Sequence, residues 1–287
     1  MYITHLIDRH CSPNVINNSI YTIKWTHVLN SFSDPTENSF IQSLQESAKQ
    51  LNGKPVNKND PVTSQMIIEL CSKFKDSDDL MIIRDLAMIV LSFAGFLRFD
   101  ELSSLTCNDV TVHDRFLNLK IVHSKSDQYS QGNDVLISKG NTLACPVSIF
   151  RHYVSLSRLI LNSDIYIFRP LYTHMGIAKL IYKNKKISYT AARENILKRL
   201  ISVEQNLNLG VHSLRSAAAR SDVNERCIKR HGRWKSDLSK DGYIADTFEC
   251  PEVLDYDFTK FSALSLCFFS RWPGHSASIH ICLFHVY

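Results

Sequence analysis

Two arginines lie in short segments in which each has a possible partner three residues away. Arg98 lies in GFLRFDEL, three residues before Glu101, and Arg215 lies three residues after His212 in HSLR. Residues three apart share one face of a helix, so Glu101 could pair with Arg98, and His212 could act on the same ligand as Arg215. A guanidinium fork matches phosphate oxygens, and histidine can donate or carry a proton. Each pair alone also fits an ordinary local ion pair or a solvent-facing helix.

A lysine and a basic cluster add further groups suited to phosphate. Lys125 lies in the polar run HSKSDQYSQGN between two expected strands, so we place it at a hairpin tip, where it could deliver a proton or simply be solvated. The segment KRHGRWKSDLSKDGY combines basic residues with Trp234 and ends in Tyr243. A basic cluster beside an aromatic is typical of nucleic-acid binding, although a solvated loop anchored by Trp234 has the same composition. The side chains that we predict to contact DNA are Lys229, Arg230, Arg233 and Lys235.

Taken in order, these residues resemble the signature of the tyrosine recombinase (phage integrase) family. That signature has an arginine followed by a glutamate, a hairpin lysine, an H-x-x-R pair, a histidine or tryptophan, and a tyrosine about nine residues later. Trp234 and Tyr243 are nine residues apart, which matches the tryptophan version. The match covers roughly residues 80 to 247. The segments HSLRSAAA and HGRWKSD are similar to eukaryotic mobile-element members of the family.

The resemblance implies a nucleophile and a proton donor for cleavage of a DNA phosphodiester. Tyr243 would attack the scissile phosphate and become joined to the DNA 3′ end, and Lys125 would protonate the departing 5′ oxygen. No metal and no other cofactor is expected, because two arginines carry the charge stabilisation. The expected partner is double-stranded DNA, bound by a homo-tetramer, with no membrane association. A eukaryotic source would imply a nuclear location.

The resemblance also implies roles for the surrounding side chains. Arg98 and Arg215 would hold the non-bridging oxygens of the phosphate. His212 would serve as a proton partner, and Trp234 would buttress the site. Glu101 would orient Arg98 through its carboxylate.

Composition and sequence features set the class of protein. The chain has 287 residues, 44% of them hydrophobic and 21% charged, so it can bury a core, and its net charge of +5 fits a polyanionic partner mildly. The eight cysteines form no CxxC pair, which disfavours a zinc site or a secreted disulfide framework. The start MYITHLIDRHC lacks the features of a signal peptide. Leu80–Leu97 is apolar but carries Arg84 and Asp85, so we expect a buried helix and a soluble intracellular protein.

The periodicity predicts a mainly α protein with a small antiparallel β-sheet (α+β). The resemblance implies that this is the tyrosine recombinase catalytic fold. Four parts are expected: a partial helical core-binding domain at 1–53, a linker at 54–63, a catalytic domain at 64–250 and an atypical tail at 251–287. Thr63 is expected to cap the helix that follows it. Expected helices are Asn14–Phe32, Ser39–Leu51, Ser64–Phe74, Ser77–Phe96, Asp100–Leu105, Val147–Leu161, Ser188–Val203 and Ser213–Ser221. Expected strands are Val110–Val112, Phe116–Val122 and Asp134–Ile137.

Departures from the family pattern leave alternatives open. The interval from Arg215 to Trp234 is several residues shorter than the family usually has, and His231 competes with Trp234 for the histidine or tryptophan position. The preferred function is a site-specific recombinase or integrase. A domesticated or decaying DNA-binding remnant without strand exchange is the alternative. A type IB topoisomerase would share the tyrosine chemistry but fits the N-terminal helices less well.

Overall fold

The chain divides into two compact units, Met1–Lys58 and Asn59–Tyr287. The computed structural model describes residues 1–53, 58–122, 132–216, 229 and 231–234. Residues 54–57 of the expected linker and the expected tail at 251–287 therefore lie outside the described residues.

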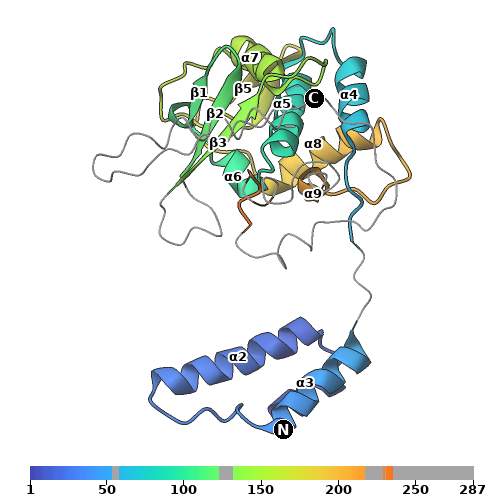
Figure 1. The fold of residues 1–287 in the computed structure, drawn as a ribbon, viewed down its shortest axis with the longest axis vertical. Coiled ribbons are helices and arrows are strands. Elements are labelled where there is room, and N and C mark those ends of the chain that lie inside the picture. The colour runs from blue at the N-terminus through green and yellow to red at the C-terminus, as the bar shows by residue number, and fades with distance from the viewer. Residues whose placement is uncertain (54–57, 123–131, 217–228, 230, 235–287) are drawn as a thin grey trace, which may run out of the picture. The chain divides into compact units, whose positions relative to one another are not determined.

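The first unit is built from helices α1 (Tyr2–Asp8), α2 (Pro13–Leu29) and α3 (Ser39–Asn52) (Figure 1). Ser12 caps α2 by accepting a hydrogen bond from the Val15 amide, and Asn38 caps α3 in the same way. We predicted α2 and α3 but gave no separate bounds for α1, which at seven residues is too short to show a periodic pattern. The core of this unit is small and consists of Ile3, Ile7, Ile16, Ile20 and Ala48.

The apolar positions predicted along α2 do not all pack against that core. Ile16 is fully buried, whereas Trp25 and Val28 keep 58% and 59% of their surface exposed. The spacing of these residues is only loosely helical, so the apolar stripe wraps around the helix and one face of it turns to solvent.

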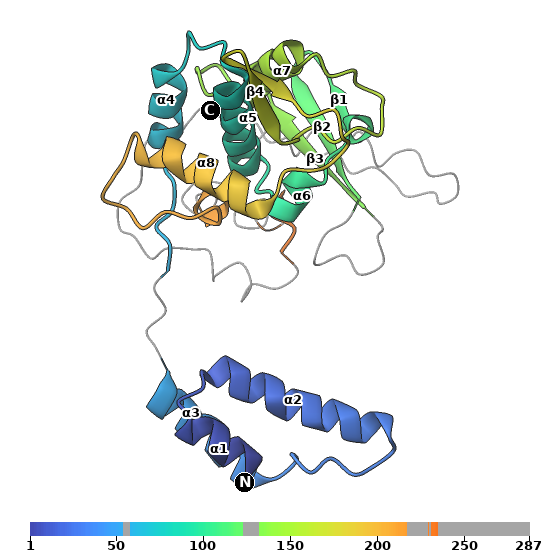
Figure 2. The same ribbon diagram turned by 180° about the vertical axis from the view of Figure 1, so that it is seen from behind.

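The second unit is organised around α5 (Leu80–Ala94), a helix buried along nearly its whole length. It packs against α6 (Phe99–Ser103), α7 (Pro146–Ser157), α8 (Tyr189–Ile201) and α9 (Ser213–Ser216). Helix α4 (Ser64–Lys73) packs on α8. Figures 1 and 2 show α5 between the strands on one side and α4 on the other.

The helix boundaries follow from local chemistry. The Thr63 hydroxyl accepts the Met66 amide hydrogen at 3.2 Å, which confirms the predicted cap of α4. Helix α5 begins later than expected because Asp79 caps it through the Met81 amide, at 2.8 Å. Helix α7 ends earlier than expected because Arg158 takes a left-handed backbone conformation (φ 54°).

An antiparallel sheet of order β1-β2-β3 packs against α7 through β3, with strands Val110–Val112, Phe116–Ile121 and Asn133–Ser138. Its strands alternate, and Leu117, Leu119 and Ile121 point into the core. A second hairpin pairs β4 (Leu171–His174) with β5 (Ile177–Leu180), and we did not predict it. Its turn residues, Met175 (φ 50°) and Gly176 (φ 77°), adopt the conformation that Asn-Gly usually signals, and methionine gives no such signal. The fold class is nevertheless confirmed as mainly α with small antiparallel sheets.

A buried charged cluster joins α5 to α8. Asp85 is fully buried and pairs with Arg84 Nη2 at 2.8 Å and with Arg199 Nε at 3.2 Å. Within the described part of the chain, no helix is both long and apolar enough to span a bilayer. Arg84 and Asp85 are themselves buried and lie on a helix that is buried along nearly its whole length, as predicted.

Candidate active site

Arg98 is held at the start of α6 by the glutamate that the sequence pairs with it. The backbone N–H of Arg98 donates to Glu101 Oε2 and its Nη1 donates to Glu101 Oε1, both at 2.8 Å. The glutamate thus caps α6 and orients the arginine at once. The Glu101 side chain is 1% exposed and that of Arg98 is 22% exposed. A buried carboxylate therefore fixes a guanidinium that reaches solvent.

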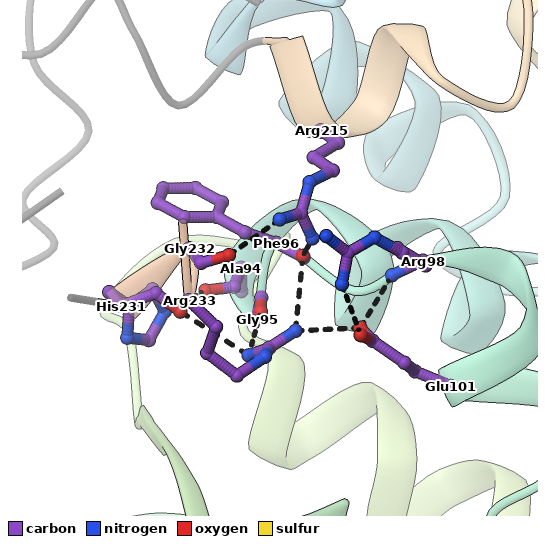
Figure 3. Close-up of polar contacts among 9 residues, drawn as sticks. All are labelled: Ala94, Gly95, Phe96, Arg98, Glu101, Arg215, His231, Gly232 and Arg233. Atoms are coloured by element: carbon purple, nitrogen blue, oxygen red, sulfur yellow. Dashed lines mark hydrogen bonds and ion pairs between the residues drawn. The ribbon is translucent and has the colours of Figure 1, made fainter. Parts of the chain in front are cut away.

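Arg215 lies on α9 and is buried, with 1% of its surface exposed. Its guanidinium donates to two backbone carbonyls, Phe96 O and Gly232 O (Figure 3). The Arg215 Cζ atom also lies 4.8 Å from the centroid of the Trp234 ring, a cation–π distance. Arg215 therefore joins the turn before Arg98 to the segment that carries Trp234.

His212 and Arg215 do not share an environment, contrary to our expectation. The His212 side chain is exposed, whereas Ser213, Leu214 and Arg215 are all buried. The His212 carbonyl accepts the backbone N–H of Arg215 at 3.0 Å, so His212 lies just before the helix. The described part of α9 packs on α5, which buries Ser213, Leu214 and Arg215 and leaves His212 outside.

Arg233 occupies a place different from the one predicted for it. We expected a DNA contact, but the Arg233 side chain is 9% exposed and its Nη2 donates to Glu101 Oε2 at 2.7 Å. It also donates to the carbonyls of Gly95 and Phe96, each at 3.3 Å. Burial lowers the pKa of Arg233, and the neighbouring Glu101 carboxylate partly offsets that effect. A carboxylate distant in sequence draws this side chain inward and leaves little of it exposed, which does not favour the predicted DNA contact.

His231 packs beside the same turn. Its Nε2 lies 2.9 Å from Ala94 O, and its ring meets Phe96 edge-on at a centroid distance of 4.9 Å. Burial lowers the pKa of His231 below its usual value, which favours the neutral ring. Trp234, by contrast, lies over the Arg215 guanidinium. Trp234, and not His231, is therefore the ring that lies at a cation–π distance from the Arg215 guanidinium.

The structure brings several of the predicted residues to one place and leaves others undescribed. Gathered around the end of α5 are Arg98, Glu101, Arg215, His231, Arg233 and Trp234. Lys229 lies beside them in sequence, and its carbonyl accepts the Trp234 amide hydrogen at 3.1 Å. Outside the described residues are Lys125, Arg230, Lys235 and Tyr243. The hairpin expected to carry Lys125 does pair as β2 and β3.

Sequence reasoning missed the backbone of the turn at Ala94–Phe96 as part of the site. A side chain at Gly95 would place its Cβ 3.0 Å from Leu91 O and 3.1 Å from Ile137 Cδ1. Glycine therefore allows the turn to lie close to the sheet. The sequence did contain a sign of this turn, because Gly95 lies near the end of the expected buried helix and three residues before Arg98.

The chain matches no protein-family model. A curated relative, the integrase/recombinase XerD homologue of Selenomonas ruminantium, is 24% identical over 254 residues, which cover 85% of this chain and 71% of the relative. Among solved structures, the Tn1549 transposon integrase in complex with transposon right-end DNA has a TM-score of 0.52, at 13% identity, over 93% of this chain and 83% of that chain. A lambda integrase dimer bound to a COC′ core site has a TM-score of 0.51, at 14% identity, over 88% of this chain and 65% of that chain.

These likenesses bear on the fold and on the family in different ways. The structural neighbours share little sequence with the chain, so they show the catalytic fold of the tyrosine recombinases and no more. The curated integrase/recombinase adds similarity in sequence along most of the chain. The chain is therefore a relative of the tyrosine recombinases in sequence as well as in fold.

Proposed function

We propose that this chain is a site-specific DNA recombinase or integrase that cleaves and rejoins DNA through a 3′-phosphotyrosyl intermediate. The observation that carries the proposal is the arrangement of two arginines around one turn. Arg215 donates to Phe96 O, and Arg98 follows two residues later with its guanidinium fixed by Glu101 (Figure 3). Two planar cations at one place suit a phosphate whose charge grows in the transition state.

The proposed reaction is a transesterification that needs no outside energy source. The Tyr243 hydroxyl oxygen attacks the scissile phosphorus and gives up its proton, and the bond from phosphorus to the 5′ oxygen breaks. Lys125 donates a proton to that oxygen, and Arg98 and Arg215 stabilise the non-bridging oxygens. Attack by a 5′ hydroxyl on the phosphotyrosine reverses the step and rejoins the DNA. The resemblance supplies the roles of Tyr243 and Lys125.

The remaining residues would support DNA binding and proton transfer. The exposed side chain of His212 is accessible to a bound phosphate, and Trp234 holds the Arg215 guanidinium from one side. Lys229, Arg230 and Lys235 remain the proposed contacts to the DNA backbone, without Arg233. Double-stranded DNA is the proposed substrate, because the Tn1549 and lambda integrase neighbours are in complex with DNA. A homo-tetramer and a nuclear location stay predictions.

The second candidate is a DNA-binding remnant that no longer exchanges strands. It is favoured by the short interval after Arg215, because Trp234 follows Arg215 by only nineteen positions. Such a protein would bind DNA through the same basic residues and form no covalent product.

Capture of DNA in an SDS-resistant adduct separates these functions. The chain is incubated with sheared genomic DNA in the presence of EDTA, and the covalent complexes are recovered and sequenced. We expect adducts from the wild type and none from Tyr243→Phe, with DNA binding nearly equal. Tyr182→Phe is the matched control, because Tyr182 is 93% exposed and lies outside the candidate site. Adducts from Tyr243→Phe would contradict the assignment of the nucleophile, and binding without adducts from the wild type would favour the remnant.

A further inference from the structure

A third arginine lies among the proposed phosphate-binding residues and forms no part of the signature that identified them. Arg233 Nη2 and the backbone N–H of Arg98 both donate to Glu101 Oε2, at 2.7 Å and 2.8 Å. The other carboxylate oxygen, Oε1, accepts Arg98 Nη1 at 2.8 Å. We propose that Arg233 is a positioning residue that fixes Arg98 through their shared carboxylate. The inference rests on the proposed function, since it assigns Arg98 to the scissile phosphate.

Arg233 contacts both elements that set the position of Arg98. Through Glu101 it reaches the first turn of α6, and through the carbonyls of Gly95 and Phe96 it reaches the turn that precedes Arg98 (Figure 3). Its own backbone lies in the left-handed region, with φ at 56°, a conformation that a non-glycine residue holds only where its surroundings demand it. The side chain therefore braces the turn and the helix against each other.

The same contacts tie the phosphate site to the chain segment that leads to Tyr243. Trp234 directly follows Arg233 and lies over Arg215, and the preceding carbonyl, Gly232 O, accepts from Arg215. Phe96 O accepts from both Arg215 and Arg233. The residues that precede the proposed nucleophile are thus joined to both phosphate-binding arginines.

The electrostatic effect of Arg233 acts in the same direction. Glu101 is buried, and its negative charge lies beside the arginine that must attract a phosphate. A second guanidinium on Glu101 balances that charge and leaves Arg98 with its full attraction for an anion. Without Arg233, the carboxylate would weaken the field at Arg98 and would have one guanidinium fewer to hold it in place.

The experiment compares variants in the full chain on a pool of random-sequence duplexes that each carry one nick. A nick near the cleavage site lets the short 5′-hydroxyl strand diffuse away, so the adduct accumulates. We expect Arg233→Met to slow adduct formation at high DNA concentration by about 10–100-fold, while DNA affinity stays within about twofold. Arg233→Lys should recover part of the rate. In the double variant that combines Arg233→Met with Glu101→Gln, the rate of adduct formation should fall by less than the product of the two single fold-decreases. Arg115→Met, an exposed arginine between β1 and β2, is the matched control for lost charge.

Each alternative gives a different result. The inference would be overturned if Arg233→Met formed adducts at the wild-type rate. It would also be overturned if the fold-decrease in the double variant with Glu101→Gln equalled the product of the two single fold-decreases. A loss of DNA affinity at an unchanged rate would identify a direct DNA contact instead. If the wild type forms no adduct, the proposed function fails, and ¹⁵N NMR of the Arg98 side chain tests the inference separately. A restricted Arg98 guanidinium that becomes mobile in Arg233→Met supports the positioning role, and an unchanged signal overturns it.

Discussion

Replacing Asp85 with asparagine removes the one carboxylate that the buried cluster between α5 and α8 places between two arginines. Both of its oxygens are engaged, Oδ1 by Arg84 and Oδ2 by Arg199, and none of its surface reaches solvent. The side chains of Arg84 and Arg199 are 3% and 12% exposed, so neither guanidinium can regain full hydration without moving. Breaking a buried pair by removing one partner costs about 3–5 kcal/mol. We expect a loss of stability of that size, a large share of the roughly 5–15 kcal/mol that domains have.

Urea unfolding followed by circular dichroism measures this cost. Asp114→Asn is the matched control, because Asp114 is fully exposed and its 3.6 Å contact with Arg151 should contribute less than about 1 kcal/mol. Arg199→Leu, which leaves the Arg84–Asp85 pair intact, should fall between the two. A cost for Asp85→Asn no larger than that for Asp114→Asn would refute the view that this cluster holds α5 and α8 together. Because α5 leads to Arg98 and α8 precedes Arg215, the same variant should also lower adduct formation.

Three further substitutions test separate parts of the structure. Gly232→Ala should destabilise the second unit and slow adduct formation, because the added methyl group would overlap the Trp234 ring; near-normal melting and activity would contradict that packing. The free energy of unfolding should fall as the pH drops below about 6.5, because a buried His231 with a lowered pKa takes up a proton more readily in the unfolded chain. His231→Gln should reduce this dependence of stability on pH, and His174→Gln, at an exposed position, should leave it unchanged. Met175→Asn should stabilise the β4–β5 hairpin by about 0.5–1 kcal/mol in thermal unfolding, since asparagine tolerates the left-handed turn; no gain would show that the turn is not strained.

Local chemistry made much of the fold predictable. The helices around Thr63 and Ser188 begin where a hydroxyl can cap them, and the alternation at Leu117–Ile121 identifies a strand with one buried face. The β4–β5 hairpin escaped prediction because its turn sequence, Met175-Gly176, is not one of the usual turn pairs. Helix caps and strand alternation each depend on a few neighbouring residues, so they can be recognised in the sequence alone.

In the candidate site, spacing predicts contacts within one helical turn better than contacts between distant segments. Glu101 pairs with Arg98 as a spacing of three suggests, because both belong to one helical turn. Arg233 looked like one of several surface charges, because the carboxylate that buries it lies 132 residues earlier. His212 and Arg215 have the spacing for one face, yet His212 lies before the start of α9 and stays exposed, whereas the packing of α9 on α5 buries Arg215. Contacts between distant segments decided each of these outcomes, and spacing does not report such contacts.

The C-terminal end of α5 gives a physical reason why Arg215 and Arg233 lie close together. The last carbonyls of a helix lack partners within it and carry the negative end of its dipole. Three carbonyls at this place accept hydrogen bonds from side chains: Ala94 O from His231, Gly95 O from Arg233 and Phe96 O from Arg215. Ala94 is the last residue of α5, and Gly95 and Phe96 follow it in the turn, so the three donating side chains satisfy the carbonyls at and just beyond the end of a buried helix. Because the same turn leads directly into Arg98, satisfying these carbonyls also assembles the cationic site, and stability and the proposed catalysis depend on the same hydrogen bonds.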